Sequence, residues 1–319
     1  MLEALTTILL AVHLLAMNVA SAGPLVCVWL GWRQQKFGEL GSQLGQKLAW
    51  YCVLALIVGM VTGALLLLTI PGNNLWSALR RFPANAYWFA GAELVFSLVC
   101  MVSLAAAWNI VSKWWLAVLA FASASNLLYH FPPLMAVIGQ LAANSRWTAE
   151  PIIDRPTQLK LMAYDEVLAL SFHFGMSSLA VAALVVLDLL SRKSVEEISH
   201  ESRSIARGTS TIALSASLLQ VPIGVWLLTS LPATSRTALM GHSIWTSLAF
   251  IAALVTTIKL LQLLVMVALG ETDKKNLRQV VSLACAVVLL MTMSLRLSRP
   301  TAPLSDEATK TASGASAQG

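Results

Sequence analysis

Hydrophobic residues are grouped in long runs that are separated by polar segments. They do not recur every two residues, as in a half-buried strand, or every three to four, as in a half-buried helix. Apolar runs of about 20 residues, enough to cross a bilayer as an α-helix, are separated by shorter segments that carry most of the charges. The pattern predicts an all-α polytopic membrane protein of about eight transmembrane helices. The predicted spans are residues 5–31, 48–70, 86–108, 114–139, 164–190, 209–231, 238–268 and 279–298.

The sequence of these spans also indicates an internal repeat of four plus four. The nine-residue segments GALLLLTIP and GVWLLTSLP, which end the second and the sixth span, both run from glycine to proline. The first and the fifth span each contain a histidine that is followed 20 positions later by a basic residue. We interpret the chain as two tandem four-helix bundles, at 1–140 and 164–299, joined by an outer loop at 141–163. The tail at 300–319 is rich in Ala, Ser, Thr and Pro and is predicted to be disordered.

Composition agrees with a lipid environment. Hydrophobic residues make up 57% of the chain and charged residues only 11%, against about 25% charged residues in soluble domains. The four cysteines lie in apolar segments and form no CxxC pair, so they predict neither a disulfide framework nor a zinc site. The net charge of +6 is modest, and nothing in the sequence supports nucleic-acid binding.

The distribution of lysine and arginine predicts the orientation, because these residues favour the cytoplasmic side of a membrane. With the N-terminus and the C-terminus outside, six basic residues fall in the outer loops and eleven in the inner ones. We therefore expect a multi-pass protein of a bacterial inner membrane with both termini in the periplasm. The inner residues are Arg33, Lys36, Lys47, Lys113, Arg192, Lys193, Arg203, Arg207, Lys274, Lys275 and Arg278.

Four of the five histidines fall within predicted spans, on four different helices. Counted from the span ends at about 1.5 Å per residue, all four lie in the outer half of the bilayer, and a reversed topology would move them together. Ionisable side chains inside a membrane are costly, and independent structural histidines have no reason to share a depth. The candidate site residues are therefore His13, His130, His173 and His242, supported at or near the same depth by Glu93, Gln220 and Arg296.

A neutral imidazole is an axial ligand of haem iron, and facing helices can supply two. We expect one or two haem b groups, with His13 paired to His130 and His173 paired to His242; a histidine paired with a methionine is the open alternative. The stretch HLLAMNVASAGPLVCVWLGWR, from His13 to Arg33, also resembles haem- or copper-associated spans of two bacterial families, the copper-resistance D type and the membrane domain of urate oxidases. The resemblance covers only this stretch and implies redox or copper chemistry near the outer face. No span carries the two histidines that mark the cytochrome b of respiratory complexes.

The sequence thus favours a membrane b-type cytochrome, or a haem-bearing subunit of a respiratory or redox complex, that transfers electrons near the periplasmic face. Its expected partners are the lipid bilayer and either other subunits of a membrane complex or a periplasmic cytochrome c. Three alternatives stay open: a copper-handling membrane protein, a proton-coupled transporter that uses Glu93 and the histidines, and a structural subunit of a larger complex. No nucleophile triad, P-loop or dinucleotide fingerprint is present, so an electron-transfer component is favoured over an independent catalyst.

Overall fold

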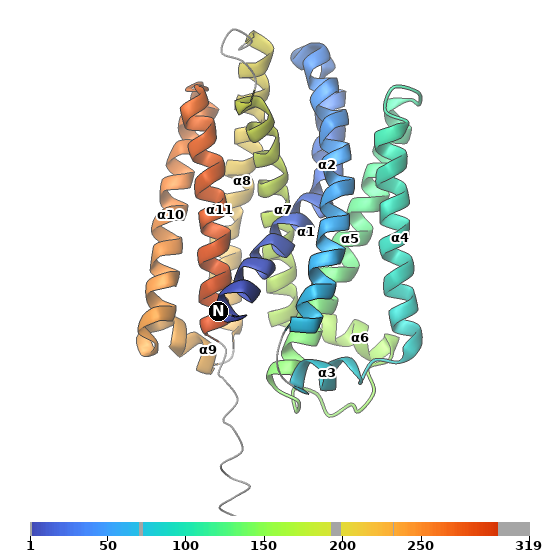
Figure 1. Cartoon of the computed structure of the whole chain (residues 1–319), viewed down its shortest axis with the longest axis vertical. Coiled ribbons are helices and arrows are strands. Elements are labelled where there is room, and N and C mark those ends of the chain that lie inside the picture. Colours follow the sequence, from blue (N-terminus) through green and yellow to red (C-terminus); the bar gives the residue numbers. More distant parts are fainter. Residues whose placement is uncertain (1, 70–72, 193–198, 232, 299–319) are drawn as a thin grey trace, which may run out of the picture.

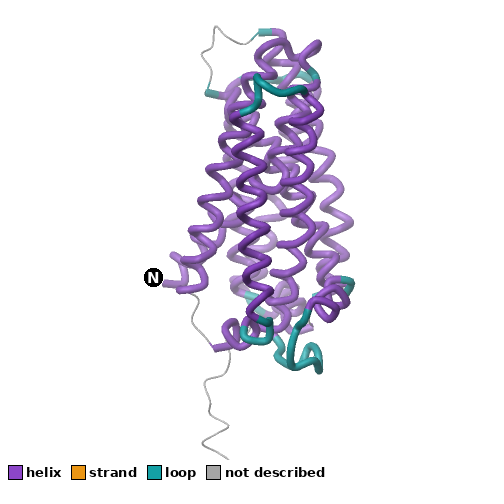
Figure 2. The backbone as a smooth tube through the Cα atoms, turned by 90° about the vertical axis from the view of Figure 1, so that its right-hand side faces the viewer, coloured by secondary structure: helices purple, strands orange, loops and turns teal. Residues whose placement is uncertain are grey.

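The computed structural model describes residues 2–69, 73–192, 199–231 and 233–298. Within these ranges every regular element is a helix. The long helices lie side by side along the long axis of the molecule, with α1 crossing the bundle obliquely, and the connecting loops lie at its two ends (Figures 1 and 2). The elements are α1 (Leu2–Trp32), α2 (Gln34–Thr69), α3 (Asn73–Leu79), α4 (Ala84–Ala106), α5 (Lys113–Ala143), α6 (Arg155–Met162), α7 (Asp165–Ser191), α8 (His200–Ser230), α9 (Ala233–Thr237), the π-helical turn η2 (Ala238–His242), α10 (Ile244–Leu269) and α11 (Lys274–Leu297).

Seven of these helices are long and apolar enough to cross a membrane: α1, α2, α4, α7, α8, α10 and α11. The remaining predicted span, 114–139, forms α5, a helix of 31 residues that packs against α1, α4 and α7 in the same bundle. Asn126, His130, Pro132 and Pro133 lie along it. The prediction of an all-α polytopic membrane protein is confirmed.

The helix boundaries differ from the prediction mainly at the end of the bundle where α1 meets α2. The polar segment between the first two predicted spans is mostly helical, because α2 begins at Gln34, although its backbone is bent at Gly38, where φ is 59°. This extension buries Phe37 before the bend, and Leu40 and Leu44, which are one helical turn apart, after it. α8 likewise begins at His200 and not at the predicted position 209. Length and hydropathy therefore located the spans but not the amphipathic turns that precede two of them.

At the opposite end, the predicted outer loop 141–163 is partly helical and belongs to a small folded cap. α5 extends into it as far as Ala143, and α6 forms most of its second half. Arg81, which follows α3, donates to the carbonyl oxygens of Ser145 and Thr148 at 3.0 and 3.2 Å. These contacts, with a cluster of buried apolar side chains from α3, α5, α6 and α7, hold the loop against the bundle. The predicted tail 300–319 lies outside the described residues.

The neighbours of the first four long helices match those of the last four. α1 packs on α2 and α5 as α7 packs on α8 and α11, and α4 packs on α2 and α5 as α10 packs on α8 and α11. The two sets meet where α1 packs on α7, and there the hydroxyl of Ser178 donates to Oδ1 of Asn18 at 2.8 Å. These two residues are 160 positions apart, the same offset that separates His13 from His173. The division into two halves stays a prediction, and this matched packing supports it.

Close approach between α1 and α2 depends on small residues, as is common for membrane helices. Gly45 lies against the indole ring of Trp108, whose side chain is only 5% exposed. The ring is fixed by a hydrogen bond of 3.0 Å from its Nε1 to the hydroxyl of Ser42. Trp108, which lies just beyond the end of α4, thus fills the space that Gly45 on α2 leaves open.

Candidate functional site at the intramembrane histidines

His13 lies on α1, and its ring packs against α2. Its Nδ1 is 2.9 Å from the carbonyl oxygen of Gly59 and 3.3 Å from the hydroxyl of Thr62. A carbonyl oxygen can only accept, so the contact with Gly59 places the proton of a neutral imidazole on Nδ1 and leaves the lone pair on Nε2. Gly63 permits this approach, since a Cβ there would lie 3.0 Å from Cε1 of the ring. α2 therefore sets both the position and the tautomer of His13.

His130 lies on α5 and faces a carboxylate on α4. Its Nδ1 is 3.3 Å from Oε1 of Glu93, and the two side chains are 27% and 24% exposed. Asn126, one helical turn before His130, donates to the carbonyl oxygen of Glu93 at 2.9 Å and to the hydroxyl of Ser97 at 2.8 Å. The side chains of α5 thus hold this stretch of α4 in register, and His130 presents the same nitrogen to an acceptor as His13 does.

His173 occupies on α7 the position that corresponds to His13 on α1. Its ring lies against α8, where a Cβ at Gly224 would be 3.9 Å from Cε1. Gly63 and Gly224 are 161 positions apart, so each histidine meets a glycine of the following long helix at a matching point. The Nδ1 of His173 is buried and has no hydrogen-bond partner among the described residues. Such a nitrogen calls for an explanation, because nearly all buried polar atoms are paired.

His242 is placed differently from the prediction. It ends the π-helical turn η2, just before α10 begins at Ile244, and it is exposed. Met240 and Gly241 have non-helical backbone angles, and the φ of Gly241 is 124°. The segment 238–243, expected as the first turns of a span, is therefore a bent connection, and His242 does not share the helical surroundings of the other three histidines.

The other two predicted supporting residues, Gln220 and Arg296, lie apart from the contact between Glu93 and His130. Gln220 lies half-buried on α8. Arg296, near the end of α11, donates from Nη1 to the carbonyl oxygen of Glu3 at 2.9 Å and to the hydroxyl of Thr7 at 3.2 Å. Arg296 thereby fastens the last helix to the first turns of α1, a structural contact that accounts for its presence near the membrane end.

The structure therefore joins one pair of the predicted site residues directly, Glu93 with His130. His13, His130 and His173 face α2, α4 and α8 respectively, and the described contacts include no hydrogen bond between any two of the histidines. The pairings of His13 with His130 and of His173 with His242 stay predictions. Within the same ranges, no three His, Cys, Asp or Glu side chains gather as a ligand set for a metal ion.

Sequence reasoning missed the groups that hold the histidines. Asn126 is four residues before His130, so the two share a face of α5, and this spacing was a signal that could have been used. The glycines opposite the rings were visible only as the start of the repeated segments GALLLLTIP and GVWLLTSLP. The acceptor for His13 is a backbone carbonyl, which no residue type reveals.

The chain was compared with protein families, with curated proteins and with solved structures, and no family model, curated protein or solved structure matches it. The class of the protein is defined by the fold: an all-α, multi-pass membrane protein that carries histidines within its apolar helices.

Proposed function

We propose that the protein is a membrane b-type cytochrome or a haem-bearing subunit of a redox complex, and that it transfers electrons near one face of the bilayer. The observation that carries this proposal is the way in which His13 and His130 are held. In both rings Nδ1 faces an acceptor oxygen, from Gly59 and from Glu93, which leaves Nε2 as the nitrogen available to iron. Histidines that ligate metals are typically oriented in this manner by a carbonyl or a carboxylate.

The chemistry of these donors fits haem b. When bound, the haem supplies an iron that alternates between the ferric and the ferrous state and carries one electron. Gly59 and Thr62 fix the ring of His13, while Glu93 holds the ring of His130. His173 adds a third imidazole within the bundle, whose buried Nδ1 the described residues leave without a partner.

The location follows from the charge distribution. The basic residues gather at the end where α1 meets α2, where α4 meets α5 and where α10 meets α11, and the cap formed by α3 and α6 lies at the other end. We infer a bacterial inner membrane with the cap on the periplasmic side. Asp165 and Glu166 begin α7 at that end, where a soluble cytochrome c or another subunit could dock, and Glu166 already accepts a hydrogen bond of 2.8 Å from Trp147.

The test is the visible spectrum of the purified full-length protein, reduced by dithionite minus oxidised, together with a pyridine haemochrome assay. The proposal expects a b-type α-band that is lost or strongly reduced in His13→Gln and His130→Gln. His200→Gln is the matched control, because His200 is an exposed residue at the first position of α8. The absence of haem from the wild-type protein would overturn the proposal, and metal analysis of the same sample would then test for copper.

A second candidate is proton-coupled transport, and the contact between Glu93 and His130 is the observation that favours it. A carboxylate and an imidazole 3.3 Å apart within a membrane can share and exchange a proton. Proton uptake by liposomes containing the haem-free protein, abolished by Glu93→Gln and kept in Glu3→Gln, would support this function. Glu3 is the appropriate control because it lies exposed in the first turn of α1.

A further inference from the structure

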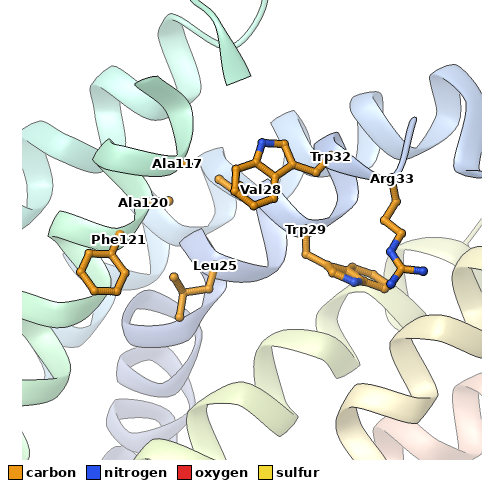
Figure 3. Close-up of a pocket in the computed structure, with 8 residues that line it drawn as sticks. All are labelled: Leu25, Val28, Trp29, Trp32, Arg33, Ala117, Ala120 and Phe121. Atoms are coloured by element: carbon orange, nitrogen blue, oxygen red, sulfur yellow. The ribbon is translucent and has the colours of Figure 1, made fainter. Parts of the chain in front are cut away.

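A groove between α1 and α5 lies far along α1 from the histidine layer, near the end where α1 meets α2. Its volume is about 520 Å³, within the range of about 300–1,000 Å³ typical of ligand pockets. On α1 it is lined by Leu25, Val28, Trp29 and Trp32, which recur at the spacing of one helix face. Figure 3 shows these side chains with those of α5 opposite them and Arg33 beside Trp29.

The groove exists because α5 presents small side chains to α1 at this level. Ala117 and Ala120 reach only a short way across, and the larger Phe121 closes the next position on the same face. The outer rim is open, since Trp32 is 51% and Phe121 67% exposed. An apolar hollow that opens on the outside of a transmembrane bundle is open to lipid and not to water.

The depth of the groove is marked by tryptophans. Trp32 packs edge to face on Trp114, with ring centroids 5.6 Å apart, and Trp115 is exposed beside it. Tryptophan is enriched where the hydrocarbon core meets the head groups. The groove therefore begins at head-group level and extends into the hydrocarbon.

Two cations at this end of the groove, Arg33 and Lys113, take part in neither of the ion pairs found among the described residues. Arg33 is exposed between α1 and α2. Lys113, the first residue of α5, donates to the side-chain oxygen of Gln34 at 2.8 Å, which brings its ammonium group next to the residue that follows Arg33. A ligand that fits has an anionic group at the mouth and a hydrocarbon chain behind it.

We infer that this groove binds an anionic phospholipid, with one acyl chain along α1 and α5 and the phosphate between Arg33 and Lys113. Basic pockets between transmembrane helices hold anionic head groups in this manner. A zwitterionic lipid would bring its own cation to the same place and would bind more weakly. This inference does not depend on haem binding.

The experiment uses the full-length protein, stripped of lipid in detergent, and counts bound lipids by native mass spectrometry. Phosphatidylglycerol and phosphatidylcholine with identical acyl chains are the probes. We expect one tightly bound phosphatidylglycerol and a clear preference for it over phosphatidylcholine. Arg33→Gln should weaken phosphatidylglycerol binding about fivefold, from the contribution of one basic residue near an anionic lipid, and leave phosphatidylcholine unchanged. Lys36→Gln, at an exposed lysine outside the groove, is the matched control.

Filling the groove provides the second arm. Ala117→Phe should remove the tightly bound lipid, whereas Val118→Phe, at a side chain 53% exposed on the neighbouring position, should not. Equal retention of the two lipids, equal effects of the two charge variants, or an unchanged lipid count in Ala117→Phe would each overturn the inference. If Ala117→Phe fails to fold, brominated acyl chains on the wild-type protein decide: tryptophan fluorescence should be quenched more by the brominated anionic lipid, and equal quenching would refute the site.

Discussion

Replacing Gly45 by alanine should destabilise the protein, although the same substitution at Gly91 should not. A Cβ at Gly45 would lie 2.6 Å and 2.7 Å from two carbon atoms of the Trp108 ring and 3.0 Å from the carbonyl oxygen of Cys27. Neither neighbour can withdraw easily, because the ring is buried and hydrogen-bonded to Ser42 and the carbonyl belongs to α1. At Gly91, on the exposed side of α4, a Cβ would meet nothing within 4 Å.

The magnitude follows from three contributions. Overpacking a helix interface costs about 1–3 kcal/mol. Losing the hydrogen bond of Trp108 as its ring shifts adds about 1 kcal/mol. The higher helix propensity of alanine offsets these losses by about 1 kcal/mol. At Gly91 this gain is the only contribution. The free energy of unfolding should therefore fall by about 1–3 kcal/mol in Gly45→Ala and rise by up to about 1 kcal/mol in Gly91→Ala.

The assay is unfolding by sodium dodecyl sulfate in mixed micelles, followed by far-UV circular dichroism and by tryptophan fluorescence. Trp108 itself should report a changed environment in Gly45→Ala before the unfolding transition. Equal or greater stability of Gly45→Ala relative to Gly91→Ala would refute the packing that the structure assigns to α1, α2 and Trp108.

At the crossing of α1 and α7, a double-mutant cycle of Asn18→Ala and Ser178→Ala should give a coupling free energy of about 0.6 kcal/mol and no more than about 1.7 kcal/mol, and additive effects would contradict the hydrogen bond. Gly63→Val should displace the ring of His13 from α2, so its haem absorption should fall to the level of His13→Gln in a sample that still elutes as a monodisperse species. A wild-type spectrum in Gly63→Val would show that haem binding does not depend on the contact between the His13 ring and α2. His242→Gln should keep the full haem content, because His242 lies exposed before α10, and a loss of haem would return it to the ligand set.

The fold could be predicted from the sequence because burial in lipid leaves a long and simple signal. Every predicted span corresponds to a helix, including α5, whose Asn126 and His130 lower its hydropathy. The helical start of α2 was missed because its apolar positions, such as Leu40 and Leu44, are separated by polar residues. An amphipathic turn outside the bilayer resembles a polar loop when only hydropathy is averaged.

The sequence could predict the depth of the candidate site residues in the membrane, but not which neighbouring helix each side chain faces. Position along a helix gives the height of Glu93 and of His130 above the membrane end, and both were expected in one layer. Which neighbour a side chain faces depends on the rotation of each helix and on the packing order, so their contact at 3.3 Å was not foreseen. The same limit applies to His13, whose partner is a backbone carbonyl on α2.

The two predicted halves each carry a histidine at a matching position but do not build the same surroundings. His13 and His173, which are 160 positions apart, each lie against a glycine of the next long helix. The contact between Glu93 and His130 has no equivalent in the second half, because α10 and α11 contain neither histidine nor carboxylate residues. Among the described residues, only the predicted first half therefore holds two imidazoles on helices whose Nδ1 contacts an oxygen of the chain. On the cytochrome proposal, this asymmetry favours one haem per chain, in the half that contains Glu93, over two equivalent haems related by the repeat.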